Sequence, residues 1–364
     1  MIKFADLIFL FRKLSSNKLT VIWAFFFFIQ PAIVSGQTIN LKKGLQISLM
    51  NKGDAFWHRS NQLGIIDQGG YISLSTYGVY NNAFDYGLYG IGNFNETNNS
   101  ELLIGFVSKN IKHYNFKIGR WKKSISSESD LSTGSLIRGN NAISIPQISL
   151  SLPDFKKYTL FNQEFWIRGG LTHGWFSKVS YIKAPLLHEK YFYLKKYFNS
   201  KSFFTIGLVH EAMWGGQTSK HGKQPQSFKD FLIVVLGRSA SNSGYIGEQV
   251  NVLGNHLGIW DLSYTIENFS KVYRFYYQHP FEDKSGMYQH FLDELKKKKL
   301  PLNSFDGMYG LEIKNKYEGI FSSFLYEYLN TMYQSGTEPQ SDTSYGWDGY
   351  FNHYIYDSGW TNYG

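Results

Sequence analysis

Apolar and polar positions alternate with a period of two residues through much of the chain from Gly69 onward, and short runs rich in Asn, Gly, Ser and Lys interrupt this alternation. The segment from Trp260 to Glu267 shows the pattern clearly. One set of alternate positions holds Trp260, Leu262, Tyr264 and Ile266, and the other holds Asp261, Ser263, Thr265 and Glu267. Because successive side chains of a strand point to opposite faces, the segment is predicted to be a β-strand with one apolar and one polar face.

The same pattern recurs in the segments that follow. Tyr273, Phe275 and Tyr277 alternate with Arg274, Tyr276 and Gln278, and Tyr309, Leu311 and Ile313 alternate with Gly310, Glu312 and Lys314. Residues 148–152 and 164–172 repeat it earlier in the chain. This rhythm predicts an all-β fold built from consecutive strands and turns.

A secreted β-sandwich and a transmembrane barrel would both produce alternating strands. The polar face of a sandwich meets bulk water, whereas here it mixes Ser, Gly, Tyr and isolated charges, as a wet lumen would. The apolar face is crowded with aromatic residues, and Tyr71, Tyr80, Tyr273 and Tyr277 lie near strand ends, where an interfacial girdle needs them. We therefore favour an antiparallel outer-membrane β-barrel over residues 69–364, preceded by a separate segment, residues 37–68.

Composition supports a barrel wall. Charged residues make up 18% of the 364 residues, below the roughly 25% of ordinary soluble domains, while aromatic residues reach 18%. The mean hydropathy of -0.30 argues against a bundle of transmembrane helices. Both values suit strands of which only alternate residues face lipid.

The first 36 residues have the layout of a secretory signal peptide. Basic residues precede a short apolar stretch, Leu19 to Ile29, and Val34, Ser35 and Gly36 offer small side chains for cleavage before Gln37. A membrane anchor is the alternative, but the stretch is shorter than the ~20 residues that span a bilayer. Cleavage would remove four basic residues and Asp6, so the mature net charge would be 9 − 4 + 1 = +6.

Catalytic signatures are absent from the sequence. The chain contains no cysteine, and its 10 histidines form no HExxH pair. His210 and Glu211 are adjacent on a predicted strand and therefore point to opposite faces. The pair Glu282 and Asp283 could bind Ca²⁺, but a solvated turn explains it as well. We predict a protein that is not an enzyme, with no metal, no cofactor and no nucleic-acid partner.

Aromatic and polar residues near the C-terminus favour sugar binding instead. Rings stack on the apolar faces of pyranoses, and neighbouring Asp, Asn and Glu bind the hydroxyl groups. The candidate polysaccharide-binding residues are Trp214, Glu282, Asp283, Trp347, Asp348, Tyr350, Asn352 and Trp360. An interfacial girdle combined with turns is the alternative explanation for each of them. The positive mature charge would suit an acidic polysaccharide.

The C-terminal third contains a series of short motifs in a fixed order. They are Phe305–Glu312, Leu325–Leu329, Gln334–Gly336, Trp347–His353 and Tyr356–Thr361. Upstream there are Phe56–Trp57 with Asn61, His210 with Trp214–Gly216, Gln249–Asn251 with Gly254–Gly258, and Tyr277–Gln278 with Glu282–Gly286. This series resembles the Wzi-type capsule assembly family, particularly its Bacteroidetes-like members, from about Phe56 to the end.

The resemblance implies an outer-membrane barrel, which we expect to be a monomer in contact with lipid. It would hold capsular or other surface polysaccharide at the cell surface, as a lectin does, without catalysis. An outer-membrane porin or sugar-selective channel remains the alternative. The family pattern continues past the Gly359–Thr361 segment, and such barrels generally end on a strand with a terminal aromatic residue. Because this chain ends at Gly364, we expect the barrel to be incomplete at its C-terminus.

Overall fold

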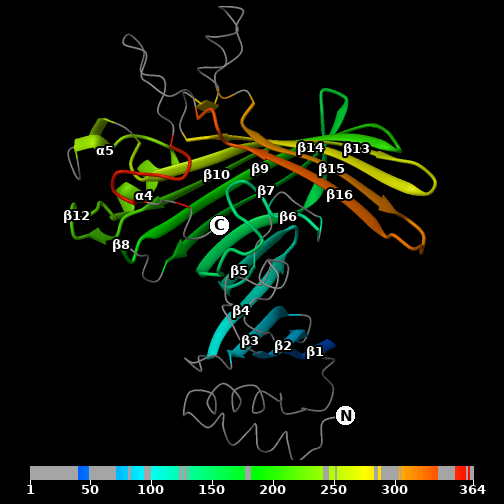
Figure 1. The fold of residues 1–364 in the computed structure, drawn as a ribbon, viewed down its shortest axis with the longest axis horizontal. Coiled ribbons are helices and arrows are strands. Elements are labelled where there is room, and N and C mark those ends of the chain that lie inside the picture. Colours follow the sequence, from blue (N-terminus) through cyan, green and yellow to red (C-terminus); the bar gives the residue numbers. More distant parts are fainter. Residues whose placement is uncertain are drawn as a thin grey trace, which may run out of the picture. The chain divides into compact units, whose positions relative to one another are not determined.

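The computed structural model of the chain consists mainly of long antiparallel strands (Figure 1). The structure describes residues 40–48, 71–80, 83–93, 100–122, 125, 129, 131–176, 182–240, 246–250, 252–282, 286–287, 303, 305–334, 349–357 and 360. The predicted signal peptide, residues 1–36, lies outside this part of the chain. The described residues fall into two compact units, whose boundary lies within the hairpin of β4 (Ser100–Ile111) and β5 (Tyr114–Arg120).

The first unit contains an antiparallel meander. Its strands are β1 (Asn40–Ser48), β2 (Tyr71–Tyr80), β3 (Phe84–Asn93) and most of β4, and each pairs with the next along the chain. Strand β1 lies within residues 37–68, which we expected to precede the barrel, and it pairs with β2 from Asn40 opposite Val79 to Ser48 opposite Tyr71. Ile91 and Leu103 form a small buried apolar cluster here.

The second unit holds a larger antiparallel sheet. Its strands are β6 (Pro146–Leu160), β7 (Gln163–Trp175), β9 (Leu186–Asn199), β10 (Ser202–Trp214), β13 (Asn255–Glu267), β14 (Lys271–Phe281), β15 (Gly307–Asn315) and β16 (Ser323–Asn330), and they are neighbours in this order. The all-β antiparallel fold that the alternation predicts is thereby confirmed, including strands at 260–267 and 309–314.

Connections at the two ends of this sheet differ in length. At one end β6 and β7 are joined by Phe161 and Asn162, both with positive φ (49° and 57°), as the tightest hairpin turns require. Ser200–Lys201 and Asn268–Ser270 make the next two turns at this short-turn end. At the opposite end, the loop end, the connections are long. One of them, between β10 and β13, carries β11 (Gln217–Thr218), β12 (Gly222–Lys223), α4 (Phe228–Val235) and α5 (Ile246–Val250), and β11 pairs with β8 (Ile182–Lys183).

The larger sheet buries charged and polar side chains on one face, together with an apolar cluster at the loop end, and exposes large apolar side chains on the other face. Register places Asp261 opposite both Gly207 and Gln278, so their side chains share one face, and Asp261 and Gln278 are only 5% and 1% exposed. On the other face Phe275 is 48% exposed. We call these the inner and the outer face. Exposed members of the outer face are Leu150, Leu171, Phe192, Phe324 and Tyr326.

Tyrosine rings on the inner face lie against glycines of neighbouring strands. Tyr193 of β9 covers Gly207 of β10, where an added Cβ would lie 2.1 Å from the ring. Tyr276 of β14 covers Gly310 of β15 in the same way. The glycines leave room for rings to lie flat along the sheet, which directs the two hydroxyl groups toward acceptors on the inner face.

None of the helices in the part of the chain that the structure describes is long and apolar enough to cross a membrane.

Candidate functional site

Buried carboxylates mark the loop end of the inner face. Glu189 of β9 and Glu211 of β10 stand directly opposite each other, and both are almost fully buried. Arg138, from the connection before β6, reaches both, with Nη2 3.4 Å from Oε2 of Glu189 and 3.1 Å from Oε1 of Glu211. Burial alone would lower the pKa of Arg138, but the two carboxylates outweigh it and raise that pKa. One guanidinium thus neutralises two carboxylates that would otherwise repel each other.

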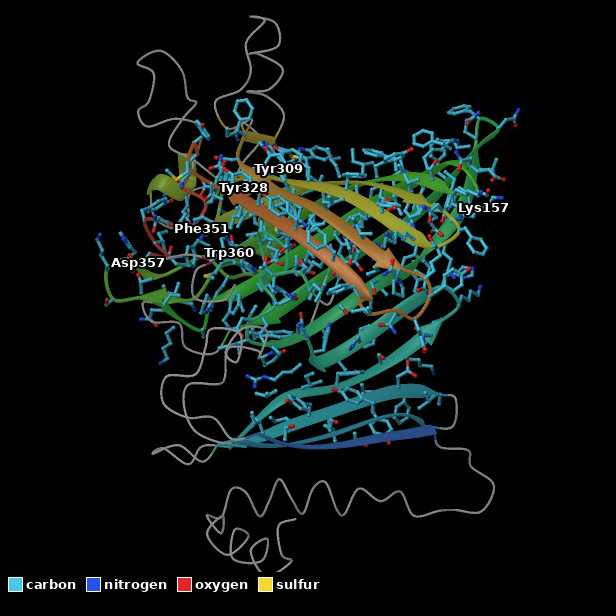
Figure 2. All side chains as sticks on the ribbon, turned by 45° about the vertical axis from the view of Figure 1, so that its right-hand side comes forward. Lys157, Tyr309, Tyr328, Phe351, Asp357 and Trp360 are labelled. Atoms are coloured by element: carbon cyan, nitrogen blue, oxygen red, sulfur yellow. The ribbon has the colours of Figure 1, made fainter. Side chains whose placement is uncertain are left out.

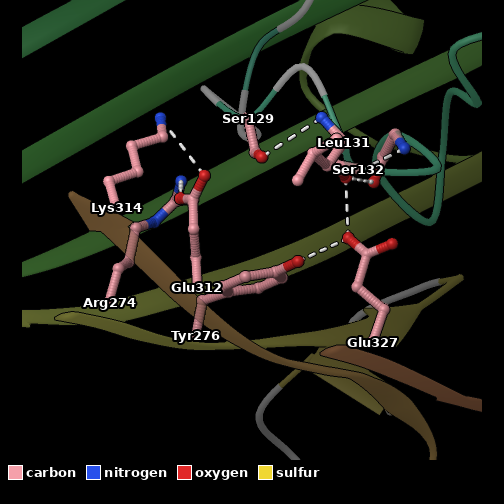
Figure 3. A network of polar contacts seen from close by, with 9 residues as sticks. Ser129, Leu131, Ser132, Arg274, Tyr276, Glu312, Lys314 and Glu327 are labelled. Carbon is pink, nitrogen blue, oxygen red and sulfur yellow. Dashed lines mark hydrogen bonds and ion pairs between the residues drawn. The ribbon is translucent and has the colours of Figure 1, made fainter. Parts of the chain in front are cut away.

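The same connection is also held on the inner face of strands β14 and β16, as Figure 3 shows. Ser132 Oγ donates to Oε1 of Glu327 at 2.7 Å, and the amide and hydroxyl of Thr133 donate to Oε2 at 3.0 and 2.9 Å. The Tyr276 hydroxyl donates to the same carboxylate. Between these anchors, the Leu136 amide donates to Oε1 of Gln278 at 3.0 Å. Residues 131–145, which we call the plug segment, therefore cover the inner face at several separate points.

Residues 349–357 form a compact turn, which we call the C-terminal turn, and it packs against the same face. Tyr350 donates its hydroxyl hydrogen to Oδ2 of Asp306 at 3.1 Å, and Asp306 also accepts the amides of Tyr333 and Gln334. Glu282 accepts the amide of Gly349 at 3.0 Å. The buried cluster that includes this turn holds Tyr350, Ile355, Tyr356 and Trp360 together with Ile137, Val209, Met213, Leu257 and Ile259.

The predicted sugar-binding residues are therefore dispersed. Tyr350 and Trp360 belong to the buried cluster on the inner face, and Glu282 holds the start of the C-terminal turn. Trp214 is 2% exposed and packs on the outer face with Ala212, Val234, Ala240 and Leu253. Asn352 is exposed. Asp283, Trp347 and Asp348 lie outside the described residues.

Exposed members of the C-terminal turn offer a better surface for a ligand than the buried tryptophans. Tyr354 is 39% exposed and stacks on His353, with ring centroids 4.4 Å apart. Asn352 and Asp357 of the same turn are also exposed, and His353 and Asp357 form a backbone bridge. Figure 2 labels Phe351 and Asp357 at this end of the molecule. A ring with a neighbouring amide and carboxylate can stack on a sugar and bind its hydroxyl groups. Tyr354 is not among the residues predicted to bind sugar, because the sequence does not show which aromatic rings are buried and which are exposed.

Basic and aromatic side chains gather on the inner face near the short-turn end. We call them the basic–aromatic cluster: Phe155, Lys157, Trp166, Arg168, Lys195, Tyr197 and Phe203. The Lys195 ammonium lies 4.0 Å from the ring centroid of Phe155 and 4.6 Å from that of Phe203. Arg168 lies 5.1 Å from the Phe155 centroid. Such contacts hold the cations over ring faces. Lys157 pairs with Glu164, and Arg168 and Lys195 leave this part of the inner face positively charged.

Within the described residues, no three His, Asp or Glu side chains are placed so that they could hold a metal ion.

Glu248 of α5 is a buried carboxyl group outside the strands. Its side chain is 0% exposed, Oε1 accepts the amide of Gly254 at 3.1 Å, and Oε2 has no hydrogen-bond partner among the residues that the structure describes. Burial raises the pKa of Glu248 to about 7, although the Gly254 amide opposes this. Burial, with Glu248 nearby, raises the pKa of Tyr356 as well, and burial lowers the pKa of His353 to about 3.

Replacing Glu248 by Gln should remove a pH dependence of stability in this loop. The folded pKa, about 7, exceeds the ordinary 4.5, so the folded state holds a proton that the unfolded state loses. Stability therefore falls as pH rises through this window, by up to about 3 kcal/mol. Gln keeps the acceptor for Gly254 and carries no charge. The opening free energy of residues 246–254, from amide hydrogen exchange across the window, should lose its slope in Glu248→Gln but keep it in Glu318→Gln, an exposed control. Equal slopes in both variants would refute the assignment.

Comparison with known proteins agrees with the antiparallel β fold described above. The family model described as capsule assembly protein Wzi matches residues 44–364. No curated protein matches the chain. A solved structure described as Wzi, an outer membrane protein involved in group 1 capsule assembly in Escherichia coli and a carbohydrate-binding β-barrel, is similar with a TM-score of 0.53 and 12% identity. The match covers 89% of this chain and 62% of that one, so the chain spans less than two thirds of its length. The likeness supports the predicted β-barrel class of fold, and the match to the family model shows that this chain belongs to the Wzi family of capsule assembly proteins.

Proposed function

We propose that this protein is an outer-membrane β-barrel that binds capsular or related surface polysaccharide and attaches it to the cell, without catalysing a reaction. Family membership supports the role in capsule assembly, and the similar solved structure is described as carbohydrate-binding. We further propose export by a signal peptide cleaved after Gly36, insertion as a monomer, and no requirement for a metal or cofactor.

The observation that carries the membrane location is the polarity of the larger sheet. Large apolar side chains are exposed on its outer face; Leu150, for example, is 53% exposed and Phe324 is 55% exposed. On the inner face, by contrast, Glu189, Glu211 and Gln278 are buried. In water this arrangement would be unfavourable, since each exposed apolar side chain forgoes about 1.5–3 kcal/mol of burial. In a bilayer the outer face meets lipid and the polar side chains stay inside.

The lengths of the connections orient the protein in the membrane. Barrels of this class carry short turns on the periplasmic side and longer loops on the outside. The loop end would then face the exterior, where a capsule lies. This places the C-terminal turn, with Asn352, Tyr354 and Asp357, on the side from which polysaccharide approaches.

Replacing Tyr354 by Ala should weaken attachment of the capsule. Loss of a stacking ring costs about 0.5–1.5 kcal/mol in addition to the lost area burial, so affinity for polysaccharide purified from the same organism should fall roughly tenfold. A strain lacking the gene should release its capsule into the medium, the wild-type gene should restore attachment, and Tyr354→Ala should restore it only in part. Capsule retained on the cell is measured by imaging and by polysaccharide assay of washed cells.

Two controls make this experiment decisive. Tyr317→Ala removes an exposed tyrosine at the short-turn end, 56% exposed, and should behave as wild type. Heat-modifiable migration in gels reports whether each variant folds. A deletion strain with an unchanged, cell-bound capsule would refute the proposed function. Full restoration by Tyr354→Ala would refute only the assignment of this residue.

A channel is the second candidate function, and the basic–aromatic cluster is the observation that favours it. Cations held on the inner face would attract anionic solutes into a lumen. The plug segment favours the anchoring role instead, because it covers the inner face at the loop end through Arg138, Thr133 and Leu136.

Conductance in planar bilayers separates these two functions. The wild-type chain should show little open current, because the plug segment fills the inner face. Arg138→Ala should raise the current, since two buried carboxylates lose their shared cation and loosen that segment, at a cost of about 3–5 kcal/mol. Lys201→Ala, which removes an exposed lysine at the short-turn end, should conduct as little as wild type. A large, anion-selective current through the wild-type protein would favour the channel.

A further inference from the structure

Helix α4 lies on the outer face of the larger sheet, at the loop end. Phe231 packs against three side chains of that face, with ring centroids 5.5 Å from His173, 5.7 Å from His188 and 6.0 Å from Trp214. Val234, 0% exposed, joins the same cluster. Lys190 of β9 also donates to the carbonyl of Val235. The helix is thus fixed across β7, β9 and β10 by one of its sides.

The helix begins at a well-formed cap. Ser227 and Asp230 make a reciprocal capping box, in which the Ser227 amide donates to Asp230 and the Asp230 amide donates to Ser227 Oγ. Asp230 is buried in this arrangement, at 9% exposure. The single carboxylate of the helix is therefore committed to its own N-terminus.

Large apolar side chains occupy the side of α4 that faces away from the sheet. Phe228, Leu232 and Leu236 are 76%, 45% and 57% exposed. Their spacing of four residues places them along one side of the helix. Trp175, at the end of β7 on the outer face, is 43% exposed, and its ring contacts that of His173, which also contacts Phe231 of the helix. The exposed apolar surface of the sheet thus continues onto the helix.

Basic residues lie close in sequence to Phe228, Leu232 and Leu236, which we call the apolar stripe. Lys220, Lys223, Lys229 and Arg238 are all exposed, and Asp230 is the one acidic residue between Gln217 and Arg238. The formal charge of residues 217–238 is therefore 4 − 1 = +3. A protein partner would account for the apolar stripe alone. Continuity with the outer face and an excess of positive charge together fit an anionic lipid surface.

We propose that α4 is an interfacial helix that binds anionic lipid beside the sheet. Phe228, Leu232 and Leu236 enter the acyl region, while Lys220, Lys223, Lys229 and Arg238 bind lipid phosphate groups above it. Long basic side chains can keep their stems on apolar surface and their charges at the headgroups. The inference rests on the proposed membrane location. It adds a defined lipid contact at the loop end, which would fix the height of that end relative to the bilayer.

Single spin labels test the proposal directly, because the chain contains no cysteine to remove. Labels are attached to Leu232→Cys, to Phe275→Cys on the outer face and to Asn352→Cys on the exposed C-terminal turn. The full chain is reconstituted in nanodiscs of phosphatidylcholine, with and without phosphatidylglycerol. Collision with oxygen reports lipid around the label, and collision with a water-soluble nickel chelate reports water. The labels at 232 and 275 should favour oxygen, and the label at 352 should favour nickel.

Each alternative outcome has a separate meaning. If position 275 favours oxygen while position 232 behaves as 352 does, the helix is in water and the inference is wrong, although the membrane location stands. If position 232 is closed to both reagents, protein covers the stripe and the inference is again wrong. If position 275 also favours nickel, the proposed membrane location fails together with the inference.

Charge is tested in the same samples. Phosphatidylglycerol should raise the oxygen accessibility of the label at 232 in the otherwise unchanged chain. The combined variant Lys223→Gln, Lys229→Gln, Arg238→Gln should lose this response while the label at 275 is unaffected. An equal response with and without the three charges would refute binding of lipid phosphates by these residues.

Discussion

Buried charge on the inner face is the constraint on which the rest of the second unit depends. Glu189 and Glu211 face each other on neighbouring strands, and Glu327 and Gln278 are set into the same face. A buried carboxylate without a partner costs several kcal/mol. The sheet therefore needs a segment that brings a guanidinium, hydroxyl groups and amides to these positions. The plug segment supplies them through Arg138, Ser132, Thr133 and Leu136. The positions of these carboxylates and of the Gln278 side-chain oxygen therefore determine the path of the plug segment across the sheet.

The outer face meets the opposite requirement. Its exposed aliphatic and aromatic side chains would contact lipid in place of water in a bilayer. Helix α4 is the one described helix of eight residues or more, and it is placed where this apolar surface reaches the loop end. The two faces therefore have different roles. The inner face binds the plug segment through polar contacts, and the outer face presents apolar surface to its surroundings.

Much of the fold could be predicted from the sequence because strand alternation is a local signal. The assignment of Asp261 and Gln278 to one face and Phe275 to the other is confirmed by their exposure. The site could not be predicted to the same degree, because it depends on contacts between distant segments. Arg138 meets Glu189 and Glu211 across more than fifty residues, and no local pattern marks this pairing. Trp360 and Tyr350 have the composition of a sugar site, yet burial in the inner cluster decides what they can touch.

Alternate labelling of one strand tests the central claim, that the outer face meets lipid and the inner face does not. Single cysteines at positions 273 to 278 of β14 would carry an environment-sensitive fluorophore in a bilayer that contains brominated lipid. Strong quenching is expected at Tyr273, Phe275 and Tyr277, and weak quenching at Arg274, Tyr276 and Gln278. Equal quenching at all six positions, or no quenching at any, would contradict it.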